Sequence, residues 1–574
     1  MLDNIADLLL TVGLLSGVFG FPTKFALRHM VPGTAIGVLV GDLLFFWMAF
    51  RVARRTGRNN VTAMPLGLDT PSTFGMVFFV LGPAFVAAQE SMTVDQAAVH
   101  TWHIGICAIF ISGLFKFACA AGSGWVRKVV PRAGLLGSLA AIALVLISFL
   151  PLLEIFHFPV VGFVALSIVL TTLVARVQFP GRLPGTLGAL LVGATLYYLM
   201  KLTGTLGHEV PDSGLNPAEA LLPYEWLTVF RFEWIAALGE TLQYLPVVIP
   251  FALATVVGGI DCTESAAAAG DEFDTNSVVG VEALATVVAG LCGGVIQTTP
   301  YIGHPAYKAM GGRAAYTLAT GLFVGGAGLL GYFGYLYFLI PKATVFPILV
   351  FIGLEISAQS FHATPRRHYT AVVLACIPAL AALTLIFLDD LQGQYAGQVG
   401  QLNQSIVHLR AVAGDALSAP ATLEAFHEVE RAGKQLETIA GNPTIGLIGE
   451  PQGPLGKQIQ TLRMLAGGFI VTSLLWASAL AALIDRKLRL AAAFFAIAGV
   501  CSLFGVMHSP MPGSPLLNPA ALPANLPHNA AGQTPFYLAT AYFSTALMLL
   551  AWDFWMRRFG GQPENRLDYE ELAA

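Results

Sequence analysis

Long apolar stretches recur along almost the whole chain, and they constrain its fold more than any other feature. Each is about 17–25 residues long, the length of a helix that crosses a bilayer. Charged residues are scarce, at 11% of 574 residues, whereas soluble domains carry about 25%. The sequence therefore predicts an all-α polytopic membrane protein with sixteen spans, near 5–22, 31–53, 64–88, 100–121, 134–152, 157–177, 184–204, 244–268, 277–294, 296–311, 314–337, 345–362, 369–388, 464–485, 489–507 and 535–556.

The composition also excludes several classes of protein. A soluble fold of this size could not solvate its surface with so few charged residues. The net charge of -4 also gives no excess of basic residues with which to bind nucleic acid. The six cysteines lie in apolar stretches without a CxxC pair, and the histidines lack the spacing of metal ligands. We therefore expect no enzyme, no metal site, no cofactor and no nucleic-acid partner.

Basic residues indicate the topology. If the N-terminus is cytoplasmic, every cluster of basic residues lies on the cytoplasmic side, as the positive-inside rule requires. Lys24 and Arg28, which follow the first span, depart from the rule. We expect a multi-pass protein of the inner membrane with both termini in the cytoplasm. The clusters that support this orientation are Arg51, Arg54, Arg55 and Arg58; Arg127, Lys128 and Arg132; Arg176 and Arg182; Arg366 and Arg367; Arg486, Lys487 and Arg489; and Arg557 and Arg558.

Two polar segments interrupt the apolar rhythm. The first, 205–243, mixes charges with aromatic residues and is expected at the outer interface. The second, 389–462, contains four basic and eight acidic residues and falls on the outer side. Apolar residues at helical spacing within it predict a helical hairpin. This insertion is either a surface cap without chemistry or a module that binds a partner or a second copy.

Two short motifs occur twice, seven spans apart. Val130–Ala133 is like Ile340–Ala343, and Met64–Pro71 is like Thr299–Pro305. An odd number of spans between two copies turns the second copy upside down. The sequence therefore predicts an inverted repeat, which is common in secondary transporters.

The second pair of motifs predicts two broken spans. Pro65, Gly67 and Pro71 cannot all lie in one continuous helix, and the same holds for the Pro and Gly residues of the later copy. Unwound backbone is tolerated in a membrane only where protein buries it or where it lines a cavity. Residues 65–75 and 300–308 are therefore candidate walls of one site near the membrane midplane.

A family resemblance rests on five stretches, 65–69, 282–290, 298–302, 311–313 and 340–343. In them the sequence resembles the nucleobase–cation symporter family, which includes the xanthine/uracil and the adenine/guanine–hypoxanthine permeases. The second branch is the more similar, and the resemblance covers residues 5–390.

The resemblance implies a 7+7 inverted repeat, with spans 1–4 and 8–11 in a core domain and spans 5–7 and 12–14 in a gate domain. It also implies a substrate site between the broken spans 3 and 10, facing span 8, and a homodimer through the gate domain. The expected parts are 1–122 (core, first half), 123–204 (gate, first half), 205–243 (outer interfacial segment), 244–338 (core, second half), 339–388 (gate, second half), 389–462 (extracytoplasmic helical insertion), 463–485 (gate, span 14) and 486–574 (two additional spans and a cytoplasmic tail).

Two glycines stand where these permeases hold the nucleobase edge with carboxylates. They are Gly258 in span 8 and Gly303 in span 10. Sulfate-permease-like transporters share the fold without those carboxylates and use half-helix ends for anions. A small anion is therefore the alternative to a nucleobase-like substrate.

Four ionisable residues near the breaks are candidates for coupling to H⁺ or Na⁺. Asp69 either binds an ion or caps the helix that follows it. Asp261 and Glu264 share one face of span 8, where they either bind an ion or mark the end of the span. His304 corresponds to Asp69 in the repeat, and it is either part of a proton-linked His–Asp contact or a buried, hydrogen-bonded histidine.

Other ionisable residues within the spans suggest structural roles. Lys116 is near the inner end of span 4, and we expect it to snorkel. Asp42, Glu282 and Glu355 are expected to lock helices together.

These residues predict a secondary active transporter, a permease for a small polar solute coupled to H⁺ or Na⁺, with elevator-type alternating access of core against gate. One alternative is a small-anion transporter or exchanger of the sulfate-permease type without cation coupling. Another is a non-transporting receptor that senses through the outer insertion. The expected substrate-binding residues are Leu68, Asp69, Thr70, Gly258, Asp261, Thr299, Tyr301, Gly303 and His304, and the expected ion-coupling residues are Asp69, Asp261, Glu264 and His304.

Overall fold

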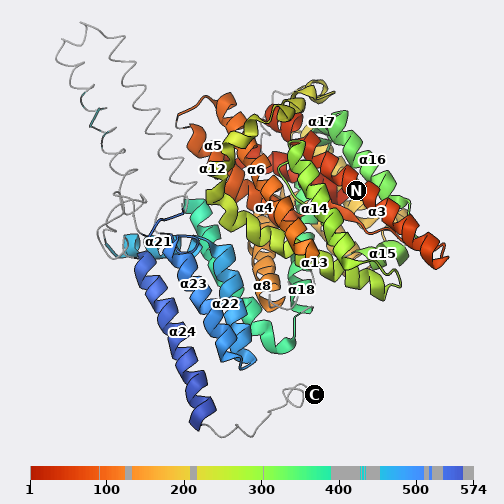
Figure 1. Ribbon diagram of the computed structural model, residues 1–574. Helices are drawn as coiled ribbons and strands as arrows, with labels where there is room; N and C mark the ends of the chain where they lie inside the picture. The colour runs from red at the N-terminus through yellow and green to blue at the C-terminus, as the bar shows by residue number, and fades with distance from the viewer. Residues whose placement is uncertain are drawn as a thin grey trace. The chain divides into compact units, whose positions relative to one another are not determined.

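The computed structural model divides into two compact units, Met1–Arg366 and Arg367–Ala574, and Figure 1 traces both. The residues that the structure describes are 2–89, 91–122, 132–206, 216–301, 303–309, 311–362, 364–388, 453–509, 516–519 and 534–559, with His427, Glu430, Arg431 and Lys434.

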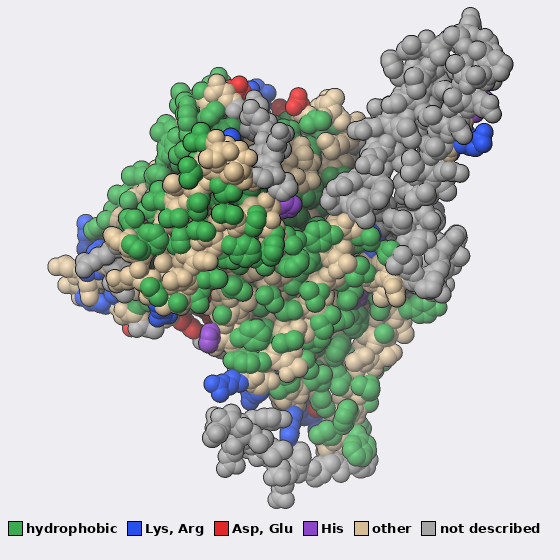
Figure 2. Space-filling view, turned by 180° about the vertical axis from the view of Figure 1, so that it is seen from behind, with side chains coloured by type: hydrophobic (Ala, Val, Ile, Leu, Met, Phe, Trp, Pro, Cys, Tyr) green, Lys and Arg blue, Asp and Glu red, His purple; other side chains and the backbone are tan. Residues whose placement is uncertain are grey.

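Every predicted span contains helical residues, but within 296–311 only 304–309 are helical and the other described residues form a short strand and loops. Hydrophobic side chains cover most of the face in Figure 2, and charged side chains gather at its margins. The fold is all-α and polytopic, as predicted. Among the described residues, nine helices are long and apolar enough to cross a membrane, or up to eleven if two bent pairs are single spans: Thr23–Thr56, Thr70–Gln89, Val94–Ala121, Leu136–His157, Gly185–Leu202, Glu233–Ala267, Lys342–His362, Arg366–Leu388 and Pro535–Arg558.

The first unit holds two short strands among its helices. β1 (Leu66–Leu68) precedes α4 (Thr70–Met76), and β2 (Thr298–Pro300) precedes α15 (His304–Ala309). Both predicted breaks are therefore present, each as a strand followed by a helix. The other helices of this unit are α1 (Leu2–Phe19), α2 (Thr23–Phe25), α3 (Val31–Thr56), α5 (Gly82–Gln89), α6 (Val94–Ala121), α8 (Arg132–Ile142), α9 (Phe149–His157), α10 (Pro159–Val169), α11 (Gly185–Leu202), α12 (Leu238–Thr241), α13 (Leu245–Ala268), α14 (Thr275–Leu291), α16 (Tyr316–Leu329), α17 (Phe333–Leu339) and α18 (Lys342–His362).

Small residues bring α3 close to α14. Gly33, Gly37 and Gly41 recur every fourth residue and so share one face of α3. A Cβ on Gly37 would lie 2.6 Å from the Cβ of Ala289, and a Cβ on Gly33 or Gly41 would overlap backbone or side-chain atoms. This small-xxx-small pattern permits the close approach of membrane helices. It also brings α3 beside Leu66 of β1.

The predicted span 314–337 is present as two helices, α16 and α17, which meet at 90°. Gly331 has a φ of 78° between them, a backbone conformation that favours glycine. The Leu222 amide donates to the Leu330 carbonyl at 3.0 Å, and a Cβ on Gly331 would overlap the Ala220 carbonyl. The bend therefore depends on a segment more than a hundred residues away in sequence.

That segment is a series of 3₁₀ turns between α11 and α13. Lys24 binds Glu219 at 2.5 Å, and Arg28 binds Glu225. The two basic residues that depart from the positive-inside pattern are thus neutralised by acids of this segment. Its short helices are η6 (Pro217–Ala220), η7 (Tyr224–Arg231), η8 (Glu233–Ala237) and η9 (Leu242–Tyr244).

The second unit begins within the apolar helix Arg366–Leu388. Its later helices are α21 (Gly453–Ala466), α22 (Phe469–Ile484), α23 (Leu488–Leu503) and α24 (Thr534–Phe559). Apolar side chains of the last three pack together around Ala482, Ala492 and Leu549. The helical hairpin predicted within 389–462 lies outside the described residues, except for four single residues and the start of α21.

Candidate functional site

The two strands pair with each other in antiparallel fashion, with Gly67 opposite Thr299. The Asp69 amide donates to the Gln297 carbonyl at 3.1 Å, and the Tyr301 amide donates to the Pro65 carbonyl at 2.9 Å. The ladder therefore extends one residue beyond the strands at each end. An antiparallel crossing is the arrangement expected of two copies of an inverted repeat.

Side chains of neighbouring helices bind the outward edges of this two-stranded ladder. The Leu68 amide donates to Asn4 Oδ1 at 2.9 Å. On β2, Lys116 Nζ donates to the Thr298 carbonyl at 2.8 Å, and the Thr298 amide donates to Thr286 Oγ1 at 3.3 Å. A backbone amide or carbonyl without a hydrogen-bond partner costs free energy inside a membrane. These side chains supply the partners and so stabilise the unwound segments.

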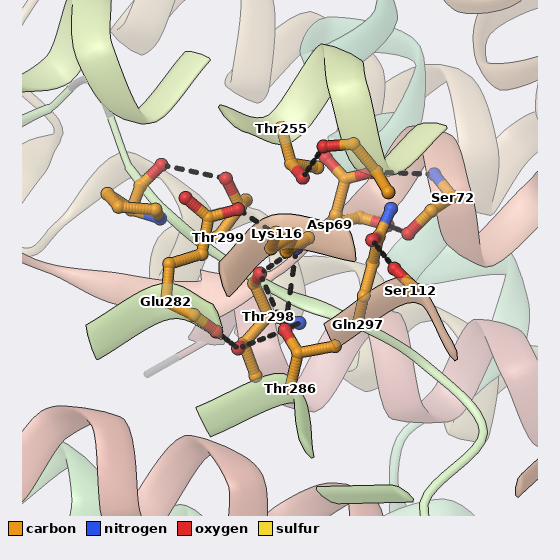
Figure 3. A network of polar contacts seen from close by, with 12 residues as sticks. Asp69, Ser72, Ser112, Lys116, Thr255, Glu282, Thr286, Gln297, Thr298 and Thr299 are labelled. Atoms are coloured by element: carbon orange, nitrogen blue, oxygen red, sulfur yellow. Dashed lines mark hydrogen bonds and ion pairs between the residues drawn. The ribbon is translucent and has the colours of Figure 1, made fainter. Parts of the chain in front are cut away.

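Lys116 of α6 also forms an ion pair with Glu282 of α14, as Figure 3 shows. Nζ lies 2.9 Å from Oε1, and both side chains are fully buried. The prediction that Lys116 snorkels is wrong, because its ammonium group finds Glu282, Thr286 and Thr298 inside the protein. The prediction that Glu282 locks two helices together is confirmed.

Asp69 caps α4. Its Oδ2 accepts a hydrogen bond from the Ser72 amide at 2.9 Å, and Ser72 Oγ donates to the Asp69 carbonyl at 3.0 Å. Beside the carboxylate in Figure 3 lies Gln297, whose Oε1 accepts from Ser112 Oγ at 2.8 Å. Of the two roles predicted for Asp69, the structure shows the cap, and ion binding stays a prediction.

A cavity of about 190 Å³ lies beside the strand crossing. The start of α4, β2 and α13 form one wall, which carries most of the polar groups, while α8 and α18 contribute apolar side chains together with Glu355, Gln359 and Ser360. The lining residues are Leu68, Asp69, Thr70, Pro71, Leu136, Leu139, Ala254, Thr255, Gly258, Asp261, Cys262, Thr299, Pro300, Tyr301, Phe351, Ile352, Glu355, Ile356, Gln359 and Ser360.

Most of the predicted substrate-binding residues meet in this cavity. Gly258 leaves open space, since a Cβ there would meet no atom within 4 Å. Gly303 does not line the cavity, because Tyr301 occupies the room that a side chain at 303 would need. Glu264 is exposed and also lies outside it. The predicted residues that line the cavity are Leu68, Asp69, Thr70, Gly258, Asp261, Thr299 and Tyr301.

His304 belongs to a different buried cluster. Its Nε2 lies 3.1 Å from the Thr62 carbonyl and 3.4 Å from Asp271 Oδ2. Asp271 also binds Lys308 at 2.6 Å. The predicted contact between His304 and Asp69 is wrong, because antiparallel strands send the helices that follow them in opposite directions. The alternative, a buried and hydrogen-bonded histidine, is confirmed.

The two other predicted locks differ from Glu282. Glu355 lines the cavity and accepts a hydrogen bond from Gln359 of its own helix at 3.0 Å, and its role as an interhelix lock stays a prediction. Asp42 is fully buried where α3 packs against α16 near Gly321, and its role as a lock stays a prediction.

Sequence reasoning did not select Lys116, Glu282 and Ser112 as parts of the site. A usable signal was present, since Ser112 and Lys116 are four residues apart on α6, as are Glu282 and Thr286 on α14. Polar pairs at this spacing share one helix face. In the described part of the chain, no group of three His, Cys, Asp or Glu side chains could hold a metal ion.

Comparisons with known proteins gave structural matches only. No family model matches the sequence, and no curated protein does. One match is the transmembrane domain of BicA, a cyanobacterium bicarbonate transporter, with 17% identity, a TM-score of 0.39 and coverage of 67% of this chain and 96% of that one. Another is SLC26A9, with 11% identity, a TM-score of 0.43 and coverage of 66% and 61% respectively.

The chain thus spans less than two thirds of the SLC26A9 chain. With TM-scores below 0.5, neither match defines the substrate of this protein. The resemblance to nucleobase–cation symporters finds no support in these comparisons.

Proposed function

We propose that the protein is a secondary active transporter and that the cavity at the strand crossing is its solute site. The observation that carries the proposal is the antiparallel crossing of β1 and β2 beside a cavity. Non-helical backbone at membrane depth, contributed by both halves of an inverted repeat, is typical of transporter binding sites.

Apolar side chains on one side of the cavity support elevator-type motion. Leu136, Leu139, Phe351 and Ile352 of α8 and α18 line it. Apolar surfaces make no directional bonds, so the polar wall and its solute can slide past these four side chains at low cost, although α18 also contributes Glu355, Gln359 and Ser360. In this proposal α8 and α18 belong to the gate, which would also form the homodimer contact.

We favour a small anion as the solute over a nucleobase-like compound. The start of α4 lies at the cavity, and its N-terminus, which carries partial positive charge, becomes available to an anion once a cation neutralises the Asp69 cap. Neither Gly258 nor Gly303 supplies a carboxylate to hold a nucleobase edge. The BicA match names bicarbonate for that protein, which makes bicarbonate a natural first anion to test.

The acids of the cavity favour coupling to a cation. Asp69, Asp261 and Glu355 line it. Three carboxylates repel an anion unless protons or sodium ions neutralise them. We therefore propose that H⁺ or Na⁺ enters with the anion.

Uptake into liposomes that contain the purified protein tests this proposal. We expect labelled bicarbonate or sulfate to accumulate under an inward H⁺ or Na⁺ gradient, and adenine and uracil not to. Gly258→Leu should abolish uptake because it fills open cavity space, whereas Gly280→Ala in α14, which also meets no atom within 4 Å but lies outside the cavity, should not. Gradient-driven uptake of a nucleobase would refute the proposal that the solute is a small anion. Uptake by Gly258→Leu at the wild-type rate would refute the proposal that this cavity is the solute site.

A further inference from the structure

A second hollow, of about 410 Å³, lies where α3 ends and α16 begins. Arg54 and Arg58 reach it from the end of α3, and Arg313 reaches it from the segment before α16. Asn59 also lines it, and no acidic side chain is among its described lining residues. Three arginines from two distant parts of the sequence thus line one hollow.

Two of these arginines lack acidic partners. In the described ranges, neither Arg54 nor Arg313 forms an ion pair, and Arg313 donates only to the neighbouring Gly312 carbonyl at 2.9 Å. Arg58 is held in place by the Gly270 carbonyl and by Asp271. The hollow therefore combines one anchored arginine with two whose charge is uncompensated.

The beginning of α16 adds to the positive potential. α16 has 14 residues, and its N-cap residue, Ala315, has no side-chain hydrogen bond to offer. The first amides of a helix lack partners within the helix and attract anions. Ala315 lines the hollow, so this end lies beside Arg313. No side chain caps it, and its Tyr316 amide donates to the Arg313 carbonyl at 3.3 Å.

The positive-inside rule explains why arginines occur at this end of α3, but it does not explain their convergence. Arg51 lies over the ring of Trp47 at 5.3 Å, and Arg55 is exposed. Neither lines the hollow. Only the arginines that lie on the hollow side of the helix end meet the arginine from the second segment.

We propose that this hollow binds an anion that carries phosphate, contacted by Arg54 and Arg313. Guanidinium groups bind phosphate oxygens in bidentate geometry, and ligand sites of this kind have volumes of about 300–1,000 Å³. The phosphate comes from a soluble compound or from the headgroup of an anionic lipid. This site is separate from the cavity at the strand crossing and does not depend on the proposed transport.

Two probes distinguish the sources. Sodium pyrophosphate is titrated calorimetrically into detergent-purified protein, and thermal unfolding is measured in nanodiscs of phosphatidylcholine with and without phosphatidylglycerol. The double variant Arg54→Gln/Arg313→Gln is compared with Arg55→Gln, which removes one neighbouring charge outside the hollow. Loss of Arg54 and Arg313 breaks no ion pair, so the double variant should unfold like the wild type without probe.

Binding of pyrophosphate that is at least tenfold weaker in the double variant and unchanged in Arg55→Gln supports a soluble phosphate. Stabilisation by phosphatidylglycerol alone, with the same dependence on the two variants, supports a lipid headgroup. If Arg55→Gln weakens binding as much as the double variant does, the anion is attracted by general positive charge and not by a specific site. That result would overturn the proposal. Absence of a response to both probes would overturn it as well.

Discussion

Lys116 Nζ lies 2.9 Å from Glu282 Oε1, with both side chains fully buried, and the same ammonium group holds the Thr298 carbonyl of β2 at 2.8 Å. This pair joins α6, α14 and one strand of the crossing. A buried ion pair is weak evidence for stability, but the loss of one member leaves an uncompensated charge. Its position next to the strand suggests that it fixes the shape of the cavity wall.

Replacing one member alone should therefore be more harmful than replacing both. We expect Glu282→Gln to lower the free energy of unfolding by about 3–5 kcal/mol. Lys116→Met/Glu282→Leu should recover most of that loss, because no buried charge remains. Uptake should stay impaired in the double variant, since the Thr298 carbonyl has lost its donor. Thermal unfolding and liposome uptake measure the two effects, and equal destabilisation by the single and double variants would contradict the account.

Substitutions at Asp69 separate its structural role from coupling. Asn is as good an N-cap as Asp, so Asp69→Asn should keep the bond from the Ser72 amide and leave thermal unfolding unchanged. Asp69→Ala should cost about 1 kcal/mol. Under the proposed coupling, Asp69→Asn abolishes gradient-driven accumulation but not exchange of labelled solute. If accumulation survives in Asp69→Asn, Asp69 is a cap and nothing more.

The features that could be predicted from sequence are those that local chemistry decides. Long apolar stretches had to become spans, and Pro65 and Pro300 with their neighbouring glycines had to interrupt two of them. The repeated motif linked the two interruptions to each other. Residues on or next to the strands, such as Leu68 and Thr299, therefore fell in the cavity as predicted.

The features that could not be predicted depend on which way a strand runs and on which helix packs beside it. His304 follows β2 by four residues, yet it binds Thr62 and Asp271 because α15 leaves the crossing in the direction opposite to α4. Lys116 is buried because acceptors on α14 and β2 meet it. No pattern within a single span contains that information.

The contact between α3 and α14 offers a test of the fold. Gly33→Ala places a Cβ against the backbone of Cys292 and Gly294, which cannot move aside as a flexible side chain can. We expect a loss of about 1–3 kcal/mol in the free energy of unfolding from overpacking. The matched control is Gly280→Ala in α14, where a Cβ meets no atom within 4 Å, and it should be neutral or stabilising because Ala favours helix. Equal unfolding temperatures for the two variants would argue against this packing.

The contacts of Asp485, which follows α22, predict that the stability of the second unit depends on pH. Burial acts to raise its pKa, but hydrogen bonds from His368 at 2.8 Å and Lys487 at 3.1 Å, with the charges of His368 and Arg367, lower the pKa below its ordinary value. A carboxyl group whose pKa is lower in the folded state stabilises the fold above its unfolded pKa of about 3.9, and this contribution disappears as the pH falls through the folded pKa.

Asp485→Asn should therefore lower the stability of the second unit by about 1 kcal/mol at neutral pH. The difference from the wild type should shrink below about pH 4, where the wild-type carboxylate becomes protonated. Thermal unfolding followed across this range measures the difference directly. Glu430→Gln, which removes a half-buried partner of the exposed Lys434, is a control for general charge effects and should be nearly neutral. A difference that does not shrink below about pH 4 would show that Asp485 is not stabilised as a carboxylate by these three partners.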